Sequence, residues 1–417
     1  MFHKKLFAML GIAALIGFLF AGCSNPSSSS GGGGTGGGDT GDGAFEVWTA
    51  ADLMNVGRGM LSGQYAGWDM TAKYKQMADI NMTGQNWNPI INTFSGGVFT
   101  GTYDGNNKTI NNITINSSRD SNLGLFYTIG AAGLVKNVKL TNCTINAWGD
   151  VGGIAATNTG TIQNCSVTGA INCSSNPIGG IAGTNTSTGT IENCFSLADV
   201  NGDQYIGGMV GSNGGTVKNS YSTGNITGDG GNTGGVVGLN YGIVQNCYST
   251  GDINASLEAG GIVGVNNSNG IIKNCFATGI IKVRSAIYNT SAGGISGTNG
   301  GVIQNCAGLN SSVTAGTTQY SYAGRVVRIT EGTLENNYGL TGMTVENYNG
   351  AVIVSSNLAG LHGADVSQAQ TATSTWWTTA GNWNDTGWDF TNIWYAPSGS
   401  TLPTLRNVGG TQDPEIQ

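Results

Sequence analysis

Residues 234–251 read GGVVGLNYGIVQNCYSTG, and the same pattern of paired glycines, short apolar runs, Asn and Cys returns along the chain. Clear copies occupy residues 152–169, 207–224 and 260–279, with further copies around Cys194 and Cys306. The Cys position falls at residues 165, 194, 220, 247, 275 and 306, which gives spacings of 29, 26, 27, 28 and 31 residues. A period in this range is typical of a solenoid, in which each repeat is one coil that packs against its neighbours.

Each copy contains apolar runs of two to four residues between Gly, Asn, Ser and Thr, which favours short strands over helices. We therefore predict an all-β fold, a right-handed parallel β-helix with about three strands per coil. Degenerate copies at Ile113, Val138 and Asn337 extend the series to about nine coils. Adjacent coils should stack about 4.8 Å apart.

Equivalent positions of the repeat should form columns along the solenoid axis. Stacked amides can hydrogen-bond to one another, and Asn tolerates the left-handed backbone of a sharp corner. One Asn column comprises Asn164, Asn193, Asn219, Asn246, Asn274, Asn305 and Asn336, and a second comprises Asn158, Asn185, Asn213, Asn240 and Asn299. The expected inner apolar column is Ile162, Ile191, Val217, Val244, Ile272 and Ile303. Its outward neighbours are Gln163, Glu192, Lys218, Gln245, Lys273 and Gln304.

The block from Gly152 to about Leu340 closely resembles the GLUG motif, a repeat of bacterial surface proteins that include adhesins and some immunoglobulin A peptidases. The WNPI stretch at Trp87–Ile90 and the segment Phe99–Ile115 look like the module that commonly precedes such repeats. The resemblance implies a surface-exposed β-helix over residues 99–340. It implies no particular chemistry.

Both ends of the repeat are expected to be capped, because an open β-helix end exposes unpaired strand edges. Residues 44–98 indicate a small α/β cap, with Thr49 and Asp52 as a capping box for a helix near 50–60 and a strand near 77–82. Residues 341–417 break the repeat and contain Trp376, Trp377, Trp383, Trp388, Trp394 and Tyr395. We expect these rings to plug the last coil, and a platform that stacks sugar rings is the alternative.

The first 43 residues indicate export. Lys4 and Lys5 precede an apolar run that ends in LFAGC, and this resembles the signal of a bacterial lipoprotein, although Phe20 replaces the usual Leu. Residues 1–22 would be removed and Cys23 would carry the lipid, so we expect an anchor in the cell envelope, in the outer membrane with the protein exposed at the surface. An ordinary cleaved signal peptide is the alternative. The Gly/Ser-rich residues 23–43 would form a flexible tether.

Net charge and cysteine placement limit the kinds of ligand that we expect. The net charge of −7 argues against nucleic acid and anionic membrane surfaces, leaving the lipid anchor as the membrane contact and a glycan or extracellular protein as the possible ligand. Besides Cys23 the chain has seven cysteines, and five of them are columnar: Cys165, Cys194, Cys247, Cys275 and Cys306. We expect these to be buried free thiols, with Ser220 as an unexplained interruption. The sequence contains no CxxC pair, so it gives no indication of a zinc site.

Few catalytic arrangements are available. The chain has two histidines, His3 in the signal and His362, so an HExxH zinc site is excluded and a Ser-His-Asp triad is disfavoured. No phosphate-binding glycine loop is present either.

Two rows of residues remain as candidate ligand-binding residues. Asp199, Asn225 and Asp252 should form an exposed stripe on three coils, with the two carboxylates about 9.6 Å apart. That separation lies at the outer edge of the range for inverting glycosidases, and Ca²⁺ binding is a weaker option. The second row is aromatic: Phe195, Tyr221, Tyr248 and Phe276. We expect these stacked rings to serve packing, and they would form a binding strip if they faced outward.

These observations favour a lipid-anchored binding scaffold or adhesin without catalysis, cofactor or metal. A polysaccharide-degrading or -modifying enzyme that uses the carboxylate stripe is the first alternative. A passive structural component of the envelope or matrix is the second.

Overall fold

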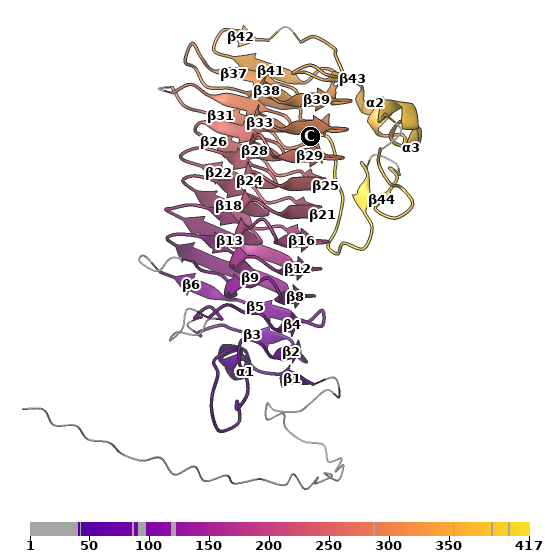
Figure 1. Cartoon of the computed structure of the whole chain (residues 1–417). Helices are drawn as coiled ribbons and strands as arrows, with labels where there is room; N and C mark the ends of the chain where they lie inside the picture. The colour runs from indigo at the N-terminus through magenta and orange to yellow at the C-terminus, as the bar shows by residue number, and fades with distance from the viewer. Residues whose placement is uncertain are drawn as a thin grey trace, which may run out of the picture. The chain divides into compact units, whose positions relative to one another are not determined.

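Each repeat forms one turn of a right-handed parallel β-solenoid, and the chain makes about eleven turns (Figure 1). The computed structural model describes residues 41, 43–85, 87–90, 97–117, 122–286, 288–352, 354–384, 387–398 and 401–417. They all fall within one compact unit, Thr35–Gln417. The expected signal peptide, Cys23 and nearly all of the tether lie outside the described residues. No helix in the described part of the chain is long and apolar enough to cross a membrane.

Five ladders of parallel strands run along the solenoid, where the sequence predicted about three. The first ladder holds the apolar inner column: β1 (Ala44–Val47), β2 (Lys73–Gln76), β4 (Thr102–Asp104), β8 (Leu134–Lys136), β12 (Thr161–Gln163), β16 (Thr190–Glu192), β21 (Thr216–Ser222), β25 (Ile243–Ser249), β29 (Ile271–Lys273), β34 (Val302–Gln304) and β39 (Thr333–Glu335). The second ladder holds the residues after the Cys position: β3 (Ile80–Asn81), β5 (Thr109–Asn111), β9 (Lys139–Ala147), β13 (Ser166–Cys173), β17 (Phe195–Ser196), the ends of β21 and β25, β30 (Phe276–Ala277), β35 (Ala307–Gly308), β40 (Tyr338–Leu340) and β43 (Ala364–Val366).

The third ladder begins with β6 (Thr114–Asn116) and the ends of β9 and β13, and continues with β18 (Asp199–Gly202), β22 (Ile226–Gly228), β26 (Ile253–Ala255), β31 (Ile281–Val283), β36 (Ser312–Thr314) and β41 (Thr344–Asn347). The fourth contains the paired glycines: β10 (Val151–Gly152), β14 (Ile178–Gly179), β19 (Ile206–Gly207), β23 (Thr233–Gly234), β27 (Glu258–Gly260), β32 (Ser291–Gly293) and β37 (Tyr322–Gly324). The fifth is β7 (Phe126–Ile129), β11 (Ala155–Asn158), β15 (Ala182–Asn185), β20 (Val210–Asn213), β24 (Val237–Asn240), β28 (Val263–Asn266), β33 (Ser296–Asn299) and β38 (Val327–Thr330).

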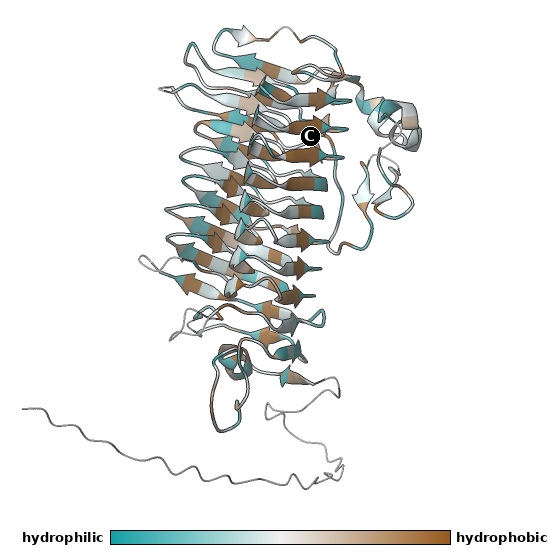
Figure 2. Cartoon of the chain, viewed as in Figure 1, coloured by the Kyte–Doolittle hydropathy of each residue, from teal (hydrophilic) through white to brown (hydrophobic). Residues whose placement is uncertain are grey.

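The solenoid has two more coils than the sequence count, and both lie in the segment expected as an N-terminal cap. Strand β1 pairs in register with β2, and β2 with β4, so that Phe45 and Tyr74 stand where later coils carry Val135 and Ile162. Because aromatic residues replace the β-branched ones at this inner position, the repeat pattern does not reveal these coils. The side chains in the bore are buried, and Figure 2 shows brown, hydrophobic segments along the strands.

Two residue types set the corners of each coil. The first Asn column adopts a left-handed backbone, with φ between 49° and 54° from Asn164 to Asn336, so it separates the first ladder from the second. The paired glycines lie where the chain passes closest to itself. A Cβ on Gly207 would stand 2.0 Å from the carbonyl oxygen of Val210, which explains why a side chain is not accommodated there.

The N-terminal end is covered by α1 (Ala50–Asn55). The predicted capping box is present, because the Thr49 hydroxyl accepts from the N–H of Asp52 while the Asp52 carboxylate accepts from the N–H of Thr49. The helix ends at Asn55, earlier than expected, because Gly57 has a positive φ of 73°. Leu53 of this helix packs into the solenoid core.

At the other end, Arg325 takes the position of the second glycine of the pair and closes the bore. Its buried guanidinium donates to the carbonyl oxygens of Leu340, His362 and Gly363 and to the Asp365 carboxylate. A short antiparallel pairing of β41 with β42 (Gly350–Ala351) follows. His362 accepts the Arg325 N–H at Nδ1, 3.3 Å away, so it belongs to this plug.

The C-terminal residues 368–417, called here the strap, lie against the second ladder rather than in the last coil. The strap contains α2 (Gln368–Thr371), α3 (Ser374–Thr378), the 3₁₀ turn η1 (Ala380–Asn382), β44 (Trp394–Tyr395) and β45 (Thr404–Leu405) (Figure 1). Its five tryptophans form one buried cluster with side chains of the second ladder, separate from the bore. The prediction that these rings plug the last coil is therefore wrong.

Candidate functional site

A row of outward-facing amides crosses four consecutive coils of the third ladder. Asn116, Asn146, Asn172 and Asn201 occupy equivalent positions on β6, β9, β13 and β18. Each follows a buried Ile or Val that points into the bore, so strand alternation turns the amide outward. Nδ2 of each of the last three amides donates to Oδ1 of the amide on the preceding coil, at 2.7, 2.9 and 3.0 Å.

These four amides line a groove of about 850 Å³. Ser117, Ala147, Cys173, Ser174 and Gly202 complete its sides, with Asp203 and Asp229 near one end. Asp229 forms an ion pair with Arg284, whose Nη2 also donates to the Gly228 carbonyl oxygen at 3.0 Å. Burial raises the pKa of the Cys173 thiol, which donates to the Gly149 carbonyl oxygen, so this thiol is protonated at neutral pH. The groove is thus a polar, largely uncharged surface.

The Asp–Asn–Asp stripe is exposed, as its alternation predicted, but its side chains are engaged by the backbone. Oδ1 of Asp199 accepts the N–H of Asn225 at 2.9 Å, and Oδ1 of Asn225 accepts the N–H of Asp252 at 3.1 Å. Oδ1 of Asp252 accepts the N–H of Ile280 at 2.8 Å. The stripe therefore links successive coils beside the third ladder, and none of its residues lines the amide groove. No group of three or more His, Cys, Asp or Glu side chains in the described ranges is placed to hold a metal ion.

The aromatic row does not form an open strip. Its rings stack face to face on successive coils, with centroids 5.1, 4.8 and 5.0 Å apart, but the strap covers them. Tyr221, Tyr248 and Phe276 are at most 1% exposed, and only Phe195 at the edge is half-buried. The Tyr221 hydroxyl donates to the Gly409 carbonyl oxygen at 2.9 Å. The rings therefore pack beneath the tryptophans of the strap and do not form a binding strip.

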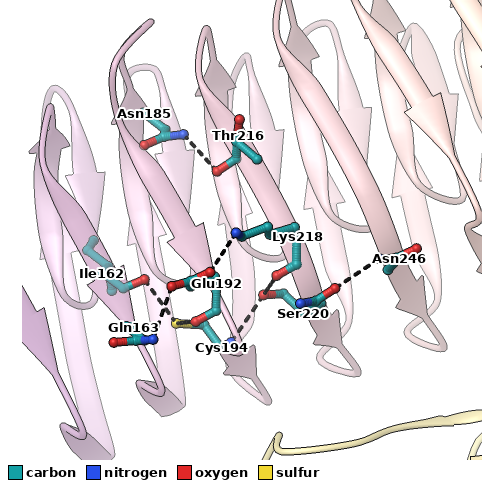
Figure 3. A network of polar contacts seen from close by, with 10 residues as sticks. Ile162, Gln163, Asn185, Glu192, Cys194, Thr216, Lys218, Ser220 and Asn246 are labelled. Atoms are coloured by element: carbon teal, nitrogen blue, oxygen red, sulfur yellow. Dashed lines mark hydrogen bonds and ion pairs between the residues drawn. The ribbon is translucent and has the colours of Figure 1, made fainter. Parts of the chain in front are cut away.

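The cysteine column is buried and free of disulfides among the described residues. Each thiol donates to the carbonyl oxygen two residues earlier in its own coil, as Cys194 does to Glu192 at 3.2 Å. Ser220 reproduces this pattern (Figure 3): its hydroxyl donates to the Lys218 carbonyl oxygen at 2.7 Å and accepts the N–H of Cys194 at 3.1 Å. The serine is therefore an equivalent member of the column, which the sequence did not explain. Burial raises the pKa of the column thiols Cys194, Cys247 and Cys275 well above the usual range.

The two Asn columns are both hydrogen-bonded along the axis. The second is fully buried, and its amides link in series from Asn158 to Asn299 at 2.7–2.8 Å. Asn266 also belongs to this series, between Asn240 and Asn299, although the column expected from the sequence did not include it. The first column is linked less completely, for example from Asn246 to Asn219 at 3.0 Å.

The amides of the groove were not singled out from the sequence. Their signal is weak but present, since an apolar residue followed by Asn recurs as TIN, TIN, AIN and DVN at separations of 30, 26 and 29 residues. The amide row ends at Asn201, because the residue paired with it on the next coil is Thr227.

Comparison with known families identifies the repeat. The GLUG motif family matches residues 229–254, which span one complete coil. The chain is a GLUG-repeat protein. Halomucin from Haloquadratum walsbyi (strain DSM 16790 / HBSQ001) is 36% identical over 126 residues, which cover 28% of this chain. The chain spans only about 1% of the length of that relative.

Two solved structures resemble the GLUG solenoid in fold. A candidate immunoglobulin A1 protease from Bacteroides ovatus has a TM-score of 0.46 at 19% identity, covering 88% of this chain and 93% of its own. An IgA1 protease has a TM-score of 0.45 at 19% identity, covering 67% of this chain and 21% of its own.

Proposed function

We propose that this GLUG-repeat protein is a lipid-anchored binding scaffold of the cell envelope, which holds an extended glycan or a segment of an extracellular protein without catalysis. The anchor would be Cys23, with the membrane contacted through the lipid alone. Labelling cells with radioactive palmitate checks this part. Label that persists in a Cys23→Ser variant would contradict it.

The observation that carries the proposal is the amide row in the 850 Å³ groove. A primary amide has two N–H donors and an acceptor oxygen, and the ladder uses only one donor and at most one acceptor bond per residue. Each coil therefore presents a spare donor and a spare acceptor about every 4.8 Å. An extended chain with hydroxyl, N–H or carbonyl groups at regular intervals fits such a surface.

Retention on a panel of polysaccharides and matrix proteins tests this role. We expect Asn146→Ala and Asn172→Ala, singly and together, to weaken retention of any ligand found by about threefold to tenfold per side chain, since each removes one or two hydrogen bonds. Asn254→Ala is the matched control, because Asn254 is exposed on the same ladder two coils beyond Asn201 and does not line the groove. Equal retention by all variants would contradict the proposed site.

The same assay separates binding from catalysis. Soluble saccharide products released by the protein and lost in Asp252→Asn would favour the enzyme alternative. If the protein is retained by no member of the panel and releases no product from any of them, a passive structural role is favoured.

A further inference from the structure

The outward side chains of the first ladder form a polar column that is internally paired over its N-terminal coils. Lys136 forms an ion pair with Asp104 at 3.3 Å. On the next coils, Gln163 Nε2 donates to Glu192 Oε1 at 3.0 Å, and Glu192 forms an ion pair with Lys218 at 2.7 Å (Figure 3). From Asp104 to Lys218, each side chain of the column has a partner on a neighbouring coil.

The pairing stops on the next three coils. Gln245, Lys273 and Gln304 continue the column in register, yet their side chains have no hydrogen bond or ion pair with any part of the chain that the structure describes. All three line a cavity of about 520 Å³, within the roughly 300–1,000 Å³ typical of small-molecule sites. Polar groups left unpaired on three successive strands, facing a cavity, are available to a ligand.

The strap forms the opposite wall of this cavity with Gly387, Asp389 and Ile393. Trp388, between two of these residues, is buried, and its Nε1 donates to the Asn305 carbonyl oxygen at 3.2 Å, which ties the wall to the solenoid. The cavity therefore exists only because the strap is docked. Its floor is formed by amides of the first Asn column.

Two opposite charges line the cavity, the Lys273 ammonium and the Asp389 carboxylate, and of the two the carboxylate is the one that has partners within its own segment. Both oxygens of Asp389 are occupied: Oδ1 accepts the N–H groups of Thr391 and Asn392 at 2.9 and 2.8 Å, and Oδ2 accepts Asn392 Nδ2 at 2.9 Å. Lys273 has no such partner. An ammonium group in the cavity disfavours a metal cation, and a single ammonium on a protein of net charge −7 disfavours a polyanion.

We propose that this cavity binds a saccharide residue that carries one carboxylate. The carboxylate pairs with Lys273 Nζ, and ring hydroxyls hydrogen-bond to the carboxamides of Gln245 and Gln304 on either side. Ile393 gives an apolar face of the sugar a surface to pack on. The site is built from the first ladder and the strap, whereas the amide groove lies on the third ladder, so either site can fail without the other.

Saturation-transfer NMR titrations of the protein test the site, with N-acetylneuraminic acid and glucuronic acid as probes and glucose as the neutral comparison. We expect one or both acids to bind more tightly than glucose and to weaken as salt is raised. Lys273→Ala should lower the affinity for the acid about tenfold or more, because a charge-assisted contact is lost. Gln304→Ala should weaken both acid and neutral sugar.

The control is Lys218→Ala, which makes the same change of charge at the same column position two coils away. It should leave the affinity unchanged, and thermal melting should show that all three variants remain folded. The proposal is overturned if neither acid binds, if glucose binds as tightly as the acids, or if Lys218→Ala weakens binding as much as Lys273→Ala. Because none of these residues lines the amide groove, these outcomes leave the groove to its own test.

Discussion

At the scale of single residues, the repeat tolerates substitutions that preserve a hydrogen-bond pattern. Ser220 replaces cysteine because a hydroxyl and a thiol can both donate to the carbonyl oxygen two residues earlier. Arg325 replaces glycine where the repeat ends, and its buried guanidinium donates to carbonyl oxygens of the last strands and of the segment that follows. Ser220 is thus an equivalent group within the repeat, whereas Arg325 marks the end of the repeat.

His362 should make stability depend on pH, and it is the only histidine after His3. Burial and the neighbouring Arg325 lower the pKa of His362, so the unfolded chain binds the proton more readily. The contribution of neutral His362 to the free energy of unfolding is complete above about pH 6.5. This contribution is lost as the pH falls through that value toward the lower pKa of His362 in the folded state. We expect the melting temperature to fall from pH 8 to pH 5, and His362→Gln to flatten this dependence.

Comparing the melting temperatures of the wild type and the His362→Gln variant across the same pH range isolates the contribution of His362. Burial raises the pKa of Asp150 and of Glu258, and these groups act in the opposite direction, because the folded state then binds their protons more tightly. They are common to both proteins and cancel in the difference. Identical pH profiles for the wild type and His362→Gln would show that the histidine has no such role.

At the scale of elements, burial separates a structural amide ladder from a candidate binding one. The ladder from Asn158 to Asn299 lies inside the coils and has no exposed amide to offer. The row from Asn116 to Asn201 uses the same amide-to-amide bond on the outer face of the third ladder. Identical chemistry therefore has different uses on the two ladders, because one faces the bore and the other faces solvent.

Asn213→Ala should destabilise the protein by about 1–3 kcal/mol, since it leaves buried polar groups of Asn185 and Asn240 without their partner. Asn254→Ala, on an exposed position, should change the free energy of unfolding by less than about 0.5 kcal/mol. Urea denaturation monitored by circular dichroism gives both midpoints. If the two variants unfold at the same urea concentration, burial does not distinguish the ladders.

At the scale of the whole described unit, the strap converts an exposed aromatic stack into a second hydrophobic core. Tyr248 and Phe276 contact Trp394, and Phe276 also contacts Trp377 and Trp388. The strap also supplies one wall of the cavity that faces Lys273. Docking of this segment thus decides which surfaces of the solenoid remain open to a ligand.

Removing residues 367–417 should expose the aromatic row and promote self-association, since a contiguous apolar patch would face water. We expect increased binding of the dye ANS and a larger mass by light scattering, with the β-sheet circular dichroism signal retained. Trp394→Ala, at a fully buried ring, should increase ANS binding, whereas Trp48→Ala, at a 37% exposed ring, should not. A truncated chain that stays monomeric and binds no dye would contradict this account of the strap.

The repeat alone determined the parallel solenoid, its Asn corners, its inner apolar column and the burial of its cysteines. These features rest on contacts between residues about 26 to 31 positions apart, and a period in the sequence reports such contacts directly. The two N-terminal coils were missed because Phe45 and Tyr74 occupy inner positions that Ile or Val fill elsewhere.

Only the tertiary structure decided which outward rows are accessible. Alternation placed the Asp–Asn–Asp stripe away from the bore and left the direction of the aromatic row open. It could not show that backbone N–H groups engage the stripe or that the strap covers the aromatic rings. The bond from Tyr221 to Gly409 joins residues 188 positions apart, across segments that share no repeat. Contacts of this kind depend on complementary surfaces that form only after the chain has folded, so no periodic pattern in the sequence records them.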